Sequence, residues 1–446
     1  MSAGRGPARP GTSRARLVLL VVASLLALVT LFGVADRAAD GRQAILKWQP
    51  AFEALESGEN IYSRPEGLVD AHALNEGYPT LPLSALFMGT LLKAGPVLGC
   101  LLFAAVKLAC AALILIGSLR LARAAGRPLP VAGEWLLLLL TLRVTLSDIS
   151  HGNTNLLVGA AVVVAALAWS RRRDGLAGGA IALGATLKVT PLLLLALPVL
   201  RRSWSGLSGF ALGLALFVVV LPGLLLGFGF NLELIGAWYE QMLAPYLTSA
   251  PLGPMQTQQI NQSLLGTMSR LLTDSMAIEA RGDTWPADVS VALVHLDETT
   301  FRWLHRGVCA VVVGLFLAAL LRRPDRRWTL AHVSLGALAM LLVSERTWKH
   351  HHVTLALPLA WCLSVAFGAG RMRERLVATA GLVASMSGHA LSGSGLMGDR
   401  GSDLAEALGA FTLADLALFS AVAWTLLAGD ERGTGAGSGD AESAVV

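Results

Sequence analysis

Long apolar runs recur along the whole sequence, and short clusters of arginine separate many of them. A helix of about 20 apolar residues crosses the ~30 Å hydrocarbon layer of a bilayer. Hydrophobic residues make up 54% of the 446 positions and charged residues 15%, which is more apolar than a soluble protein of this length. The pattern predicts an all-α polytopic membrane protein.

The arginine clusters orient the predicted helices. Basic residues in short loops stay in the cytoplasm, and placing every short cluster inside gives about 12 transmembrane helices with both termini cytoplasmic. The role of these clusters in orienting the helices explains the net charge of +5, so nucleic acid is not expected as a partner. The predicted crossings are residues 17–34, 97–119, 131–146, 156–169, 175–187, 190–200, 206–226, 306–321, 329–343, 353–368, 376–391 and 405–427.

The same pattern divides the sequence into one domain and two tails. Residues 1–16, rich in Gly, Pro, Ser and Arg, predict a disordered cytoplasmic tail, and residues 429–446 predict another. Residues 17–428 form the transmembrane domain, which two long outer loops, 35–96 and 227–304, interrupt. The four cysteines fall in apolar segments, where a thiol behaves as a small hydrophobic group, so neither a disulfide framework nor a metal site is expected.

Three apolar segments are too short to cross the membrane upright. Residues 81–92 predict a helix that lies at the interface. Residues 175–187 and 190–200 lie between two arginine clusters, and a hairpin keeps both clusters on the cytoplasmic side. Broken helices of this kind are tolerated where they are buried in protein or line a cavity. We therefore expect Lys188, at the tip of the hairpin, to point into a polar chamber.

The densest polar group between two apolar runs is Ser344–His352, which reads Ser-Glu-Arg-Thr-Trp-Lys-His-His-His. Ionisable residues at a membrane boundary are costly unless they face water, a cavity or a partner. In the predicted topology this group and other polar interruptions emerge on the outer face, which indicates an extracytoplasmic pocket for a polar, anionic group. The other residues on that face include Asp36, Asp40, Tyr78, Asn153, Asn155, Lys188, Asn261 and Gln262.

These residues also have simpler structural interpretations. The charges of Ser344–His352 suit a solvated loop. Asp36 and Asp40 suit ordinary helix ends, whereas Asn153 and Asn155 suit the cap of the following helix. The three successive histidines do not share one face of a helix, so we do not expect them to form a metal site.

Five short motifs lie in order between the first outer loop and the tenth predicted crossing. They are Gly58–Tyr62 with Tyr78–Pro82, Gly152–Asn155, Leu187–Pro191, Asn261–Leu264 and Trp348–His351. Together they resemble glycosyltransferase family 87, membrane mannosyltransferases of the GT-C superfamily that use a polyprenyl-phosphate sugar donor. Three details differ from the family pattern. Val189 stands where proline is usual, Asn153–Thr154 stands where the family has Gln or Asn with a shorter spacer, and Asp40 lies further from Tyr62 than the family's first-loop aspartate does.

The resemblance implies a GT-C fold, in which outer-loop helices cover a membrane cavity, and an aspartate general base at the end of the first crossing. Asp40 is our candidate base, with Asp36 as the alternative, and His350 and His351 complete the predicted catalytic group. Transfer from a lipid phosphate also needs cations that hold the phosphate. We assign phosphate contacts to Lys188 and Arg346 with the two histidines, and sugar contacts to Asn153, Asn155, Asn261 and Gln262. Packing against the sugar or the prenyl chain is assigned to Trp48, Tyr78 or Trp348.

The predicted function is inverting transfer of a hexose, with mannose as the expected sugar, from a polyprenyl-phosphate donor to a lipid- or glycan-linked acceptor. We place the active site on the extracytoplasmic face of the cell membrane. No cofactor, metal or nucleic acid is expected, and the partners are the donor, the acceptor and membrane lipids. The alternatives are a transporter or flippase of polar lipids, which would also place Lys188 in a membrane cavity, and a ligase of lipid-linked polysaccharide.

Overall fold

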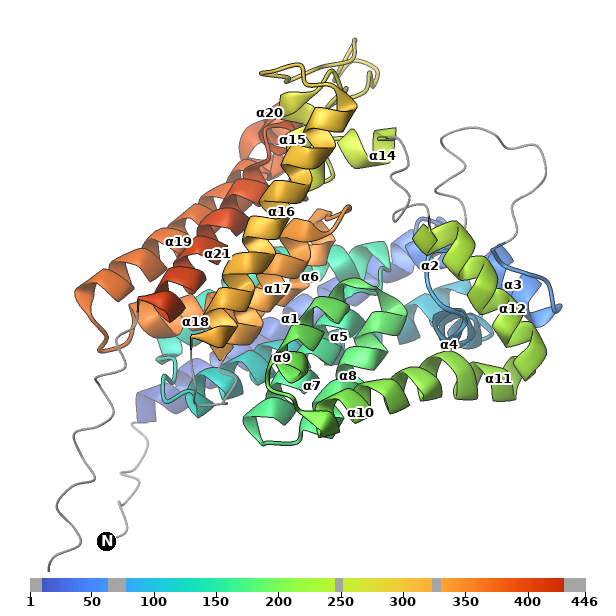
Figure 1. The fold of residues 1–446 in the computed structure, drawn as a ribbon, viewed down its shortest axis with the longest axis horizontal. Helices are drawn as coiled ribbons and strands as arrows, with labels where there is room; N and C mark the ends of the chain where they lie inside the picture. The colour runs from blue at the N-terminus through green and yellow to red at the C-terminus, as the bar shows by residue number, and fades with distance from the viewer. Residues whose placement is uncertain (1–9, 63–77, 245–251, 323–329, 429–446) are drawn as a thin grey trace, which may run out of the picture.

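The computed structural model describes residues 10–62, 78–244, 252–322 and 330–428, and there the chain is built almost entirely of helices (Figure 1). Strand-like pairing in these ranges is confined to two isolated bridges of the second outer loop, Ile278 with Val289 and Arg281 with Trp285. The predicted all-α class is confirmed.

Five helical segments are long and apolar enough to cross a membrane. Shorter apolar helices accompany them, so the chain is a multi-pass membrane protein. The total of about 12 crossings and the cytoplasmic position of the termini stay predictions. The five long segments are Val21–Lys47, Pro96–Ala124, Trp204–Leu226, Glu298–Leu321 and Ala410–Leu427.

The first part of the chain contains one long helix, an outer loop of short helices and three further apolar helices. The long helix α1 continues past the predicted end of the first crossing and carries Asp36 in its last turns. The elements are α1 (Pro10–Ala39), α2 (Ala44–Lys47), α3 (Gln49–Glu56), α4 (Pro82–Leu92), α5 (Pro96–Ala124), α6 (Val131–His151) and α7 (Asn155–Ser170).

The middle of the chain is interrupted more often. A 3₁₀ segment follows the break at Lys188, and π-helical turns occur within the next long segment and after α12. The elements are α8 (Asp174–Leu187), η2 (Thr190–Leu195), α9 (Ala196–Leu200), α10 (Trp204–Leu214), η3 (Ala215–Val220), α11 (Leu221–Leu226), α12 (Phe228–Trp238) and η4 (Tyr239–Leu243).

The last part of the chain surrounds α17, whose residues are nearly all buried. In Figure 1, α19, α21 and α16 run side by side on one flank of the molecule, with α15 and α20 at their upper end. The elements are α14 (Pro254–Thr257), α15 (Leu264–Leu272), α16 (Glu298–Leu321), α17 (Leu330–Val343), η5 (Lys349–Leu355), α18 (Ala356–Ala366), α19 (Met372–Leu391), α20 (Ser394–Ala407) and α21 (Ala410–Leu427).

Several predicted boundaries are wrong by a few turns. Helix α1 begins at Pro10, so residues 10–16 are helical where a disordered tail was predicted. Helix α16 begins at Glu298, inside the predicted outer loop. Once a helix is nucleated by an apolar run, adding polar residues at its end requires little free energy, which explains both extensions. The tail residues 1–9 and 429–446 lie outside the described residues.

The predicted hairpin is present. Helix α8 forms one arm, and η2 with α9 forms the other. The hydroxyl of Ser203, which follows the second arm, donates to Oδ2 of Asp174 at the start of the first arm, at 2.6 Å. The two ends of the hairpin therefore lie together, and Lys188 lies at the opposite end.

Close contact between α8 and α10 holds the hairpin against the next helix. A Cβ on Gly178 would lie 2.0 Å from the carbonyl oxygen of Gly206, and one on Gly209 would lie 2.1 Å from that of Gly175. Small residues let helix backbones approach closely in a membrane, where packing rather than water drives association. The glycines of these two helices thus fix where the hairpin tip lies.

Candidate functional site

A cavity of about 520 Å³ opens among segments that are distant in the sequence. Its walls come from the turn after α1, the last turns of α6 and the start of η5. None of the described residues that line it carries a carboxylate, whereas four carry a lysine or arginine cation and two carry an imidazole. The cations are Arg42, Lys47, Arg143 and Lys349, and the imidazoles are those of His151 and His350.

Helix α6 supplies one wall of this cavity. Arg143, Ser147 and His151 are spaced by four residues and therefore lie on one face of the helix. Nδ1 of His151 lies 2.7 Å from the carbonyl oxygen of Ser147, to which it donates. This leaves Nε2 of His151 as a hydrogen-bond acceptor on an exposed ring.

Arg143 is oriented by backbone carbonyls. Its guanidinium donates to the carbonyl oxygens of His389 and Ser392, the second at 2.5 Å, and its Cζ lies 5.8 Å from the centroid of the Phe411 ring. Neutral carbonyls orient the group, and among the described residues no carboxylate lies within ion-pair distance of it, although Glu406 is near enough to act on its charge. Arg143 therefore presents a fixed positive charge to the cavity.

The other cations of the cavity differ in their partners. Lys349 forms an ion pair with Glu406, a carboxylate that is 1% exposed. Burial raises the pKa of Glu406, and Lys349 opposes that shift. Arg42 is paired with Asp40 and lies 3.5 Å from Asp36. Lys47 is exposed and, among the described residues, has no carboxylate within ion-pair distance.

Aromatic rings of residues 348–351 separate this cavity from a smaller chamber. Trp348 stacks on His351 with ring centroids 5.9 Å apart and an interplanar angle of 12°. His350 faces the cavity and stacks on His151 at 5.8 Å. In the part of the chain that the structure describes, no group of three or more His, Cys, Asp or Glu side chains is arranged to hold a metal ion.

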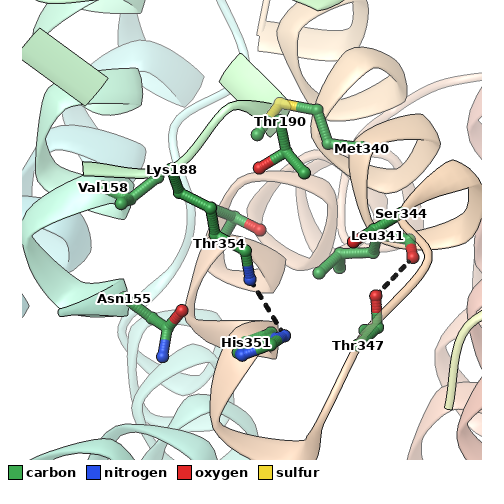
Figure 2. Close-up of a pocket in the computed structure, with 10 residues that line it drawn as sticks. All are labelled: Asn155, Val158, Lys188, Thr190, Met340, Leu341, Ser344, Thr347, His351 and Thr354. Carbon is green, nitrogen blue, oxygen red and sulfur yellow. Dashed lines mark hydrogen bonds between the residues drawn. The ribbon is translucent and has the colours of Figure 1, made fainter. Parts of the chain in front are cut away.

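Lys188 and His351 meet in the smaller chamber, as Figure 2 shows. The Lys188 ammonium lies 3.0 Å from Nδ1 of His351, and the backbone N–H of Trp348 donates to the same nitrogen at 3.1 Å. The same nitrogen also lies 3.2 Å from the carbonyl oxygen of Arg346, so three groups converge on Nδ1 of His351. Four hydroxyl-bearing residues and three apolar side chains also line the chamber: Thr190, Ser344, Thr347 and Thr354, and Val158, Met340 and Leu341.

A buried ion pair that the sequence analysis missed supports the turn between α6 and α7. The ammonium of Lys107 lies 3.0 Å from Oδ2 of Asp148, and both side chains are fully buried. Asp148 also accepts hydrogen bonds from Asn155 Nδ2 at 2.9 Å and from the backbone N–H of Leu156 at 3.4 Å. Asn155 is thus held by Asp148 at the edge of the chamber, while Asn153 lines the cavity.

Asn261 and Gln262 are buried away from the cavity, so their predicted sugar contacts are corrected. Asn261 donates to the carbonyl oxygens of Gln256 and Glu345 and accepts from two backbone N–H groups. Gln262 donates to the carbonyl oxygens of Gln259 and Glu406 and accepts from Phe411. Protein groups use both amides, so Asn261 attaches the second outer loop to the residues after α17, and Gln262 attaches it to the turn between α20 and α21.

Tyr78 also lies in the interior and not at the cavity. Its hydroxyl is 2.7 Å from Ser84 Oγ, and its ring packs edge-on against Trp48 and Phe52. Burial raises the pKa of Tyr78 to about 12. The predicted packing of Tyr78 against a sugar is replaced by a structural role under the first outer loop.

Asp40 and Arg346 lie beside the two cavities without lining them. Asp40 follows the last turn of α1, is half exposed and reaches the large cavity only through Arg42. The backbone carbonyl oxygen of Arg346 lies 3.2 Å from Nδ1 of His351. The guanidinium of Arg346 interacts electrostatically with the neighbouring Glu345. Burial raises the pKa of Glu345, and the Arg346 guanidinium opposes that shift.

Two further buried polar groups hold the site together. Arg270 is fully buried and donates to the carbonyl oxygens of Thr257, Gln258, Asn261, Glu406 and Ala407. His352 bridges the carbonyl of Trp348, at 3.1 Å, and Oδ2 of Asp415 on α21, at 2.8 Å. These contacts fix the outer loop and the 348–351 segment against the helices.

The helices and the cationic cavity define a multi-pass membrane protein whose site suits an anionic ligand. The chain belongs to glycosyltransferase family 87, because the model of that family matches residues 78–344. This confirms the predicted family, and the protein is a membrane glycosyltransferase. Asp40 and the 348–351 segment lie outside the matched residues.

The chain was also compared with solved structures and with curated proteins. The chain is similar to ArnT from Cupriavidus metallidurans bound to undecaprenyl phosphate, with 12% sequence identity and a TM-score of 0.41. The match covers 92% of this chain and 77% of that chain. No curated protein matches the chain.

Proposed function

We propose that the protein transfers a hexose, with mannose as the expected sugar, from a polyprenyl-phosphate donor to a lipid- or glycan-linked acceptor, and that the phosphate and sugar of the donor bind in the 520 Å³ cavity. The observation that carries this proposal is the cavity lining, which combines several cations with no carboxylate among the described lining residues. The volume lies within the ~300–1,000 Å³ typical of small-molecule sites.

The positive charge of the cavity lining suits a reaction in which the phosphate is the leaving group. A phosphodiester donor carries one negative charge, and the phosphate monoester that departs carries about two near neutral pH. Arg143 and Lys47 are the cations of the cavity that no described carboxylate pairs with. Groups held in place before the reaction stabilise charge that develops in the transition state. Arg143, anchored by carbonyls, is placed to do this.

The acceptor hydroxyl needs a base. Asp40 is our candidate, because it is joined to the cavity through Arg42, and Asp36 remains the alternative on the same helix. Asn153, His151, Trp348 and His350 line the cavity and supply contacts for the sugar. Lys188 and His351 lie on the other side of the aromatic rings, in a chamber of about 20 Å³. They are proposed to support phosphate binding through their charge and by orienting the wall that Trp348 and His350 form, without touching a phosphate in the large cavity. A single displacement inverts a β-linked donor to an α-linked product.

We place this reaction on the extracytoplasmic face of the cell membrane, with no cofactor besides the donor. A flippase of polar lipids is the second candidate, because the chamber at Lys188 lies at a broken helix. The family assignment favours the transferase, since transport leaves the sugar–phosphate bond intact.

The test is a transfer assay with the purified protein in lipid bilayers. A polyprenyl-phosphate hexose with radiolabel in the sugar is incubated with the protein and a membrane extract that supplies acceptors. The proposal predicts that label moves into a new product, whose anomeric configuration, read by NMR, is opposite to that of the donor. Label that crosses the bilayer but stays on the polyprenyl phosphate would support the flippase instead.

A further inference from the structure

The turn after α1 folds Arg42 back over the end of that helix. Gly41 adopts φ +69°, and the N–H of Arg42 donates to the carbonyl oxygen of Arg37 at 2.7 Å, while the N–H of Gly41 donates to Ala38. This is the Schellman arrangement, which favours glycine at the left-handed position. The turn sets the direction in which the Arg42 side chain leaves the backbone.

Arg42 lies between two carboxylates and the cavity. Its Nη2 is bonded to Oδ2 of Asp40 and lies 3.5 Å from Oδ2 of Asp36. Arg42 lines the 520 Å³ cavity, whereas neither carboxylate does. The same guanidinium therefore faces both the candidate base and the space that a phosphate would occupy.

The ion pair is of a kind that a ligand can break. The exposed fractions are 58% for Arg42, 55% for Asp40 and 76% for Asp36, and ion pairs between exposed side chains contribute little. A phosphate among the other cavity cations offers Arg42 two parallel charge-assisted hydrogen bonds, which are stronger than a solvated contact. A phosphate in the cavity would thus compete successfully for Arg42.

We propose that Arg42 is shared between Asp40 and the donor phosphate, so that Arg42 holds Asp40 while the cavity is empty and releases it when the phosphate binds. This rests on the proposed function. The donor then binds first and exposes the base to the acceptor. The acceptor oxygen forms a bond to C1 of the sugar, its proton passes to the Asp40 carboxylate, and the C1–O bond to phosphate breaks with its electron pair on the phosphate.

The sequence allows each carboxylate to be followed separately. Trypsin cuts after Arg37 and Arg42, which places Asp36 and Asp40 in different peptides. The protein in lipid bilayers is labelled with a water-soluble carbodiimide and an amine, with and without geranylgeranyl methyl phosphate. This probe is a phosphodiester like the donor but has no sugar. Binding of the radiolabelled probe is measured in the same samples.

In the wild type we expect the probe to raise the labelling rate of Asp40 severalfold. In Arg42→Gln we expect Asp40 to label rapidly without the probe and to show no further rise. Lys47→Gln is the matched control, because Lys47 lines the same cavity but pairs with neither aspartate among the described residues. This variant should bind the probe more weakly yet show the wild-type rise once the probe is saturating.

The outcomes separate the two proposals. Labelling of Asp40 that stays constant or falls while the probe binds would overturn the shared role of Arg42 and leave the proposed function standing. A wild-type protein that binds no prenyl phosphodiester would refute the cavity as the donor site, and the role of Arg42 would fail with it.

Discussion

The ammonium of Lys188, at the tip of the α8 hairpin, lies 3.0 Å from Nδ1 of His351, a residue 163 positions further along the chain. This contact joins the broken helix to the segment that walls the cavity. It orients the His351 ring and, through the stacking of Trp348 on that ring, the cavity wall. Substitutions at Lys188 should therefore affect the reaction more than the fold.

We expect Lys188→Met to weaken donor binding and the rate together by ~2 to 4 kcal/mol, because a desolvated charge beside the cavity and its contact with His351, which orients the cavity wall, are both lost. Expression and thermal unfolding should stay close to those of the wild type. Steady-state kinetics with varied donor concentration measure the effect, and Lys188→Arg serves as the charge-conserving control. Wild-type kinetics in a well-expressed Lys188→Met protein would refute the role of this residue.

Asp40→Asn keeps the shape of the side chain but removes the proton acceptor. Transfer should fall by ~10² to 10⁴-fold, the range for loss of a general base, while donor binding persists. Asp36→Asn is the matched control and should have a much smaller effect. If Asp36→Asn is instead the inactive variant, the base lies one helical turn earlier on α1 and the cavity assignment is unchanged.

Lys107 and Asp148 form a buried ion pair, and removing either partner should lower the free energy of unfolding of the protein. Lys107→Met leaves an uncompensated buried carboxylate, which we expect to cost about 3 to 5 kcal/mol of unfolding free energy. In the double variant Lys107→Met with Asp148→Asn, most of the loss should be recovered, because the introduced amide is neutral and its oxygen still accepts from Asn155. Thermal unfolding in bilayers measures both variants, and an unchanged midpoint for the single variant would contradict the prediction.

The hairpin predicts that Asp174 and Ser203 lie on the same side of the membrane, since their side chains are hydrogen-bonded at 2.6 Å. Cysteines introduced singly at these positions, in a protein without its native cysteines, should react with a membrane-impermeant reagent only from the cytoplasmic side. A cysteine at the exposed position Glu59, in the first outer loop, provides the opposite reference. Labelling of the two hairpin positions from opposite sides would exclude a hairpin within the membrane.

Much of the architecture could be predicted because apolar length and basic clusters are local properties of the sequence. The break at Lys188 was predictable, since a single crossing there would strand one arginine cluster outside. The helix starts at Pro10 and Glu298 were not predictable, because polar residues can extend a helix without changing the hydrophobic pattern.

The candidate site could be predicted only in outline. The sequence placed Lys188 and His351 on one face, but their pairing depends on helix packing over 163 residues. It also offered Asn261 as a sugar ligand, because it does not reveal that backbone groups use the whole amide. Lys107 and Arg143 were missed, although a charge inside an apolar run is itself a signal of a buried functional group.

The most direct test of the central claim is an electron cryomicroscopy structure of the protein in bilayers with polyprenyl phosphate bound. We predict phosphate density in the 520 Å³ cavity, within hydrogen-bond distance of Arg143 and with Arg42 turned away from Asp40. Phosphate density outside this cavity, with Arg143 and Arg42 in their present contacts, would contradict the assignment of the cavity as the donor site.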